Sequence, residues 1–110
     1  NNKIDDLPDE IEEIRMNSYY FDKTVDKLPK GLRKIYFGYL FNQKIDKLPE
    51  NLEELYLGHK FNMPIDNLPN NLKILRTGTK FNQPVDKLPG KIRKIYNPYI
   101  EKIPKEIKDK

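Results

Sequence analysis

The side chains best suited to chemistry recur at fixed intervals instead of gathering in one place. Aspartate stands every 20 residues before an x-Leu-Pro string, at Asp26, Asp46, Asp66 and Asp86. Carboxylates stacked about 5 Å apart on successive turns of chain suggest a calcium site. A calcium ion needs six or more oxygen ligands, however, and lysines follow three of the four aspartates. An Asx-turn, in which the carboxylate accepts the N–H two residues on, explains the string better, so we expect no metal.

The sequence gives little support to an enzymatic function. His59 is the only histidine and Ser18 the only serine, and no cysteine is present. These residues cannot supply a Ser-His-acid triad, a zinc site or a thiol nucleophile. The five glycines are dispersed and form no phosphate loop. Adjacent carboxylates such as Glu53 and Glu54 are expected on opposite faces of a strand. We therefore predict a non-enzymatic protein without cofactors.

The chain that positions these side chains is an array of 20-residue units. The strings FDKTVDKLP, FNQKIDKLP, FNMPIDNLP and FNQPVDKLP begin at Phe21, Phe41, Phe61 and Phe81. Each unit also contains a strand-like segment, at residues 11–17, 32–38, 52–58, 72–78 and 92–97. One unit is too short to close a core, so successive units must stack, with their strands side by side in a parallel sheet. A glycine at the end of three strands, as at Gly58, indicates a backbone conformation that a Cβ would disfavour.

The pattern L-x-x-L-x-L-G followed by F-N-x-P-I-x-x-L-P resembles a leucine-rich repeat, and more narrowly the FNIP repeat. The FNIP tetrapeptide is best matched at residues 61–65 and 81–85, and the resemblance covers residues 3–107. It implies an α/β-type repeat solenoid that is mostly β and irregular, with little or no helix. The coil would be right-handed, with a parallel sheet on its concave face. It also implies inward asparagines that link one coil to the next, at Asn42, Asn62 and Asn82.

Relatives with such repeats occur in social amoebae and the giant DNA viruses of amoebae, where many carry an F-box before the repeats. The resemblance thus implies a substrate-recruiting arm of a ubiquitin ligase and a cytoplasmic location, although these 110 residues contain no F-box. We expect one domain over residues 1–110, with about five coils and a shortened closing coil at residues 98–110.

The positions that vary between units are the candidates for binding. Two outward rows are predicted on the sheet, and their partner-binding members are Lys34, Glu54, Ile74 and Lys94 in the first row and Tyr36, Tyr56, Arg76 and Tyr96 in the second. Tyrosine and arginine dominate protein interfaces, which favours a protein partner of unknown identity. The alternative is that the same tyrosines and ion pairs only stabilise the sheet. A third group, Tyr39, His59, Thr79 and Tyr99, follows the strands.

Other partners are less consistent with the composition. The net charge is +4, but an aspartate stands beside each lysine near the turns, so nucleic acid is disfavoured. No apolar run approaches the roughly 18 residues of a membrane span. The ends of a solenoid are its weak points, which leaves end-to-end self-association as the assembly alternative.

Overall fold

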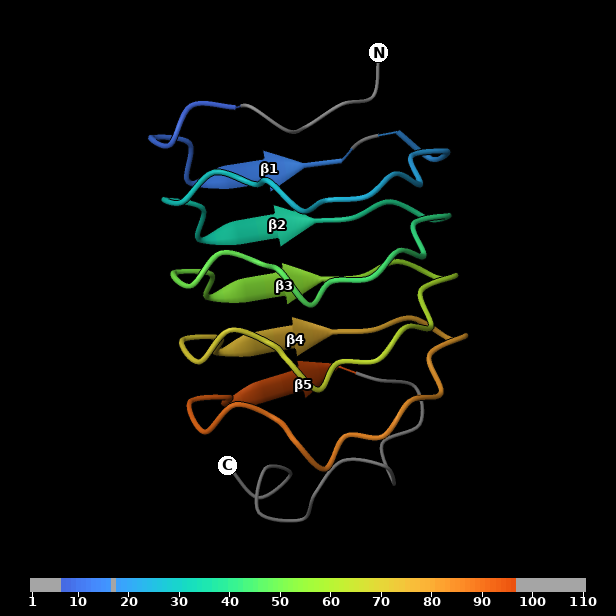
Figure 1. Ribbon diagram of the computed structural model, residues 1–110. Coiled ribbons are helices and arrows are strands. Elements are labelled where there is room, and N and C mark those ends of the chain that lie inside the picture. Colours follow the sequence, from blue (N-terminus) through green and yellow to red (C-terminus); the bar gives the residue numbers. More distant parts are fainter. Residues whose placement is uncertain (1–6, 17, 97–110) are drawn as a thin grey trace.

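The computed structural model describes residues 7–16 and 18–96, which form a stack of five coils (Figure 1). Each coil contributes one short strand, and the strands pair in sequence order into a single parallel sheet. They are β1 (Glu13–Arg15), β2 (Lys34–Tyr36), β3 (Glu54–Tyr56), β4 (Ile74–Arg76) and β5 (Lys94–Tyr96). These ranges contain no helix, and therefore none long and apolar enough to cross a membrane. The predicted solenoid with a parallel sheet is confirmed, and the proposed closing coil at residues 98–110 lies outside the described residues.

The strands are only three residues long, shorter than the segments expected from the sequence. The register nevertheless keeps the period of the sequence, since Ile35 pairs with Leu55 and Leu55 with Leu75. Backbone bonds extend the ladder slightly beyond the strands, as where the Phe37 N–H donates to the Tyr56 carbonyl at 2.9 Å. Beyond these bonds each coil turns away to form the rest of its circuit, which limits the length of the strand.

The core consists of columns of equivalent residues, one from each coil. The rings of Phe21, Phe41, Phe61 and Phe81 are almost fully buried and stack nearly parallel, with centroids 6.1 to 6.2 Å apart. A second column consists of Leu32, Leu52, Leu72 and Ile92, and the inward strand residues form a third. Full burial of each such side chain stabilises the fold by about 1.5–3 kcal/mol before chain entropy. The core is thus continuous along the stack.

Each coil enters its strand through a turn that begins at proline. The carbonyl of Pro29 accepts the Leu32 N–H at 3.2 Å, and the same bond recurs from Leu52 to Pro49, Leu72 to Pro69 and Ile92 to Pro89. The repeated aspartates before these prolines are exposed in turns. The structure gives none of these carboxylates a hydrogen bond to the N–H two residues on, so the expected Asx-turn is wrong.

The asparagine column links the coils, but from a different position than expected. The Asn42 Oδ1 accepts the Asn62 N–H at 2.8 Å, and the Asn62 Oδ1 accepts the Asn82 N–H at 2.8 Å. Asp22 begins the series by accepting the Asn42 N–H. The side chains of Asn62 and Asn82 are exposed, so the prediction that they point inward is wrong. A short polar side chain reaches the neighbouring backbone best from the surface of the stack, because the buried position beside it is filled by phenylalanine.

The glycines after the strands are required by the close approach of adjacent coils. A Cβ built on Gly58 would lie 2.2 Å from the carbonyl oxygen of Gly38, and one on Gly78 would lie 2.5 Å from that of Gly58. None of the glycines has a left-handed φ, so the conformational explanation expected from the sequence is wrong. Glycine is needed here because two backbones occupy the space that a methyl group would take.

Gly58→Ala is expected to destabilise the protein by about 1–3 kcal/mol or more, because the added methyl group meets backbone that is already held by the neighbouring coils. Gly90→Ala is the matched control, since a Cβ there meets nothing within 4 Å. This control should leave stability unchanged or raise it by up to about 1 kcal/mol. Urea unfolding followed by circular dichroism measures both. Equal stabilities of the two variants would contradict the close-approach explanation.

Candidate functional site

The outward side chains of the five strands share one surface, which we call the sheet face. Alternation along each strand buries the central residue, such as Leu55, and turns its two neighbours outward. The register then aligns the predicted rows: Lys34 with Glu54, Glu54 with Ile74 and Ile74 with Lys94, and likewise Tyr36, Tyr56, Arg76 and Tyr96. All eight predicted partner-binding residues therefore lie on one surface.

On β1 to β3 these side chains are engaged with one another. The rings of Tyr36 and Tyr56 stack with centroids 4.3 Å apart and an angle of 2° between their planes. The guanidinium of Arg15 lies 4.3 Å from the centre of the Tyr36 ring. The Tyr56 hydroxyl donates to Glu54 at 2.6 Å, and Glu54 pairs with Lys34 at 3.6 Å. This half of the face has the stabilising contacts that the alternative interpretation predicts.

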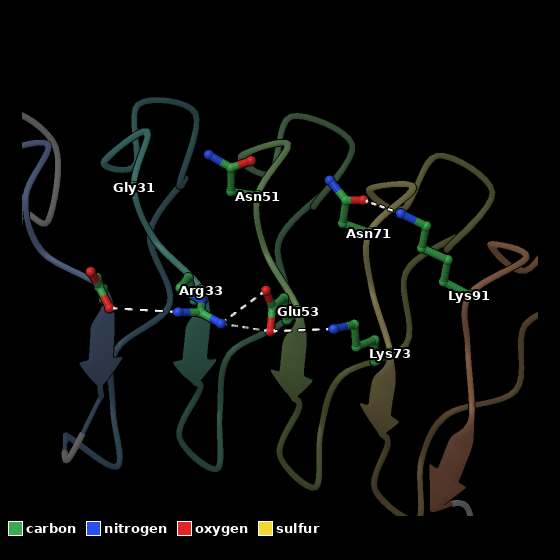
Figure 2. A pocket seen from close by; sticks show the side chains of 8 residues that line it. Gly31, Arg33, Asn51, Glu53, Asn71, Lys73 and Lys91 are labelled. Atoms are coloured by element: carbon green, nitrogen blue, oxygen red, sulfur yellow. Dashed lines mark hydrogen bonds and ion pairs between the residues drawn. The ribbon is translucent and has the colours of Figure 1, made fainter.

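A third row, which the sequence analysis missed, stands where the chain enters each strand. Arg33 donates to both oxygens of Glu53 at 3.1 Å and lies 4.0 Å from Glu12, while Lys73 lies 3.9 Å from Glu53 (Figure 2). A charged residue at each equivalent position, with the sign alternating from Glu12 through Arg33 and Glu53 to Lys73 and a second cation at Arg93, is the signal that could have revealed it. The row borders an open hollow of about 520 Å³.

Asparagines form the far side of this hollow. The side-chain amide of Asn51 donates to the Lys30 carbonyl at 3.4 Å, and that of Asn71 donates to the Glu50 carbonyl at 3.1 Å. Asn71 in turn accepts a 2.8 Å hydrogen bond from Lys91, which extends over the hollow (Figure 2). These amides connect the turns of neighbouring coils and give the hollow a polar wall.

Glu53 and Glu54 do not point to opposite sides of the sheet. Both line a smaller hollow of about 280 Å³ together with Lys73, Ile74, Arg93 and Lys94. The expectation from strand alternation is wrong here because β3 begins only at Glu54, so Glu53 lies outside the pleat. Carboxylates at successive positions thus share one side of the molecule, where Glu53 pairs with Arg33 and Lys73 and Glu54 pairs with Lys34.

These contacts shift the protonation of three groups. The hydrogen bonds from Arg33 hold the pKa of Glu53 below its ordinary value, and Glu53 raises the pKa of Arg33 in return. Burial, followed by the hydrogen bond to Glu54, raises the pKa of Tyr56. Glu53 therefore stays ionised at neutral pH while the Tyr56 phenol stays neutral, which preserves the pairing of Glu53 with Arg33.

The β4 and β5 half of the face is different. The side chains of Arg76 and Lys94 make no ion pair within residues 7–16 and 18–96, and Tyr96 is 50% exposed. Ile74 is half-buried between them. Of these four predicted residues, Arg76, Lys94 and Tyr96 are therefore exposed, and within the described ranges none of them makes the ion pairs or ring stacks found on β1 to β3.

A separate aromatic stack runs along the edge where the strands end. Tyr19 stacks on Tyr39 at 4.6 Å, and Tyr39 stacks on His59 at 4.8 Å. His59 also lies in hydrogen-bonding contact with Thr79. Tyr39, His59 and Thr79 thus form one column as the sequence spacing indicates, and Tyr99 lies outside the described residues. No three His, Cys, Asp or Glu side chains in the described ranges come together as a possible metal site.

Tyr56 is expected to ionise above pH 10, the ordinary region for tyrosine, because burial and Glu54 oppose a second negative charge. A phenol whose pKa is raised by folding contributes stability that is complete below about pH 10 and is lost as the pH rises further. Near-ultraviolet phenolate absorbance, taken as the difference between the wild type and Tyr56→Phe, measures the titration of this group. Its midpoint should lie clearly above pH ~10, and a midpoint at pH ~10 would contradict the described contacts.

Comparison with known proteins agrees with this geometry. The FNIP Repeat family matches residues 24–60 and 41–67. Among solved structures, the chain is similar to CroV588, described as a novel circular LRR protein structure, with 35% sequence identity and a TM-score of 0.74. The match covers 88% of this chain but only 16% of that one, so the present chain spans a small part of its length. No curated protein matches the chain. The family match over residues 24–67 and the stacked coils show that the chain contains FNIP repeats and forms a solenoid like that of a leucine-rich-repeat protein.

Proposed function

We propose that this solenoid is a non-enzymatic module that binds a protein partner through its sheet face. Leucine-rich-repeat-like folds generally mediate protein–protein interaction, and the finer assignment to this face rests on one observation. The core columns keep one residue type or a close equivalent from coil to coil, whereas the outward rows change chemical type, with glutamate, lysine or isoleucine in the first row and arginine or tyrosine in the second. A surface that served only to stabilise the sheet would not need this variety.

The exposure of the β4 and β5 half supports the same proposal. Tyr96 and Arg76 are neighbours in the register, and neither is used in contacts within the sheet face. Tyrosine and arginine are the residues that most often contribute large binding energies at interfaces. The paired half would then act as a rigid border that positions the open half, because its side chains are already fixed by mutual contacts.

The family resemblance adds a cellular setting to the proposal. Attachment to an F-box, and with it the recruitment of substrates to a ubiquitin ligase in the cytoplasm, stays an expectation from relatives. The residues of the sheet face do not identify the partner, so the first experiment must find it without assuming its nature.

Affinity capture from amoebal lysate, at low and physiological salt, tests the proposal with wild type and the Tyr36→Ser/Tyr56→Ser/Tyr96→Ser variant. A specific partner should be retained by the wild type at both salts, and its affinity should fall at least about tenfold in the variant. The single variant Tyr96→Ser should show much of the loss without disturbing the Tyr36–Tyr56 stack. Circular dichroism must first show that the variants are folded.

Tyr20→Ser is the matched control, because Tyr20 is 75% exposed but lies away from the sheet face. It should capture the partner as the wild type does. Equal retention by the wild type and the folded triple variant would contradict binding through this face. The assembly alternative would then gain support if the chain's mass in solution rose with concentration.

A further inference from the structure

The charges of the sheet face are divided between its two halves. All of its carboxylates belong to the coils of β1 and β3, as Glu12, Glu13, Glu53 and Glu54. Every one of them is paired: Glu13 with Arg15 at 2.6 Å, Glu54 with Lys34, and Glu12 and Glu53 with Arg33. The cations of β2 lie between these two acidic coils. The positive and negative charges of the β1 to β3 half therefore nearly cancel.

The β4 and β5 half has no such balance. Residues 71–76 and 91–96 contain no carboxylate, and their cations are Lys73, Arg76, Lys91, Arg93 and Lys94. Lys73 shares Glu53 with Arg33, and Lys91 bonds only to the neutral amide of Asn71 (Figure 2). Arg76, Arg93 and Lys94 form no ion pair in the described part of the chain. Among the described residues of the sheet face, cations without a carboxylate partner are thus concentrated on two adjacent coils.

The hollow of about 280 Å³ reaches from this cationic half to Glu53 and Glu54 on the coil of β3. Arg93 and Lys94 form its basic side, the half-buried Ile74 contributes apolar surface, and Glu53 and Glu54 close it on the side of β3. Tyr96 lies beside Arg76 in the next row and presents half of its surface. A ligand at this place would meet cations, one aliphatic side chain and one aromatic ring.

We infer that the β4 and β5 half of the sheet face binds a short acidic segment of a partner protein, an inference that rests on the proposed function. The strands of two adjacent coils lie only about 5 Å apart. In an extended peptide, side chains on the same face are about 7 Å apart. Two or three carboxylates would therefore reach Arg76, Arg93 and Lys94, with an apolar side chain between them against Ile74 and Tyr96. Glu53 and Glu54 form the boundary of the site on the β3 side, because they would repel further acidic residues of the ligand.

The same arrangement disfavours a nucleic acid. A phosphate backbone carries charge continuously and gains affinity by contacting many cations along its length. Here the cationic area ends at Glu53 and Glu54, so a longer polyanion would run into carboxylates. A local group of acidic side chains on a protein fits a local cationic area, and arginine recognises carboxylates through paired hydrogen bonds.

Fluorescence anisotropy with the full chain at physiological salt tests the inference. The probe is a labelled peptide, Gly-Ser-Glu-Glu-Leu-Glu-Glu-Ser-Gly, and its control has glutamine in place of every glutamate. The acidic peptide should bind at least about tenfold more tightly than the glutamine peptide. The Arg93→Gln/Lys94→Gln variant should lose about tenfold in affinity for the acidic peptide. Lys27→Gln/Lys47→Gln removes the same charge from exposed turns and should change affinity less than about twofold.

Three results would overturn the inference: no preference for the acidic peptide, equal losses in both double variants, or tighter binding of a thymidine oligonucleotide of similar length. The captured partner separates this inference from the proposed function. A partner that needs Tyr96 but is retained fully by Arg93→Gln/Lys94→Gln would leave the proposed function standing and refute the acidic segment. A partner retained by the folded triple tyrosine variant would refute the proposed function itself.

Discussion

No coil of this protein can fold without the coil beside it, and the rest of the structure depends on that constraint. The ring of Phe61 is buried between those of Phe41 and Phe81, and the Leu57 N–H finds its acceptor on Arg76 of the next coil. Both interactions repeat because the coils from β2 to β5 keep a 20-residue register, whereas β1 pairs with β2 across 21 residues. The fixed period of these coils therefore keeps the partners of the core and the backbone ladder aligned.

The same constraint leaves the outward positions of the strands free to vary. Since the aligned core and the backbone ladder hold the coils together, a residue such as Arg76 or Lys94 can remain unpaired without loss of the fold. In the β1 to β3 half, the outward side chains contact one another, as in the stack of Tyr36 on Tyr56. In the β4 and β5 half, Arg76, Arg93 and Lys94 form no ion pair with the described residues. This difference between the halves is where the structure supports a binding role most strongly.

Much of the fold could be predicted because it depends on one repeated interval. The Phe21 to Phe81 column and the rows of the sheet followed directly from the spacing. Features set by distances between coils could not be predicted in the same way. Glycine is needed at position 58 because the carbonyl oxygen of Gly38, 20 residues earlier in the sequence, occupies the space of a Cβ. Nor does strand alternation apply to Glu53, since that residue precedes the pleat. The charged row at the strand entrances does not follow from strand alternation, because its residues precede the strands.

Removal of one whole coil tests the central claim most directly. Deletion of residues 41–60 joins two coils in the same register, so the shortened chain should keep its circular dichroism spectrum and unfold cooperatively in urea, with an m-value lower by roughly a fifth. Deletion of residues 41–50 removes half a coil and should abolish the fold. A folded half-coil deletion, or a whole-coil deletion that fails to fold, would contradict the account that register between equal coils determines this structure.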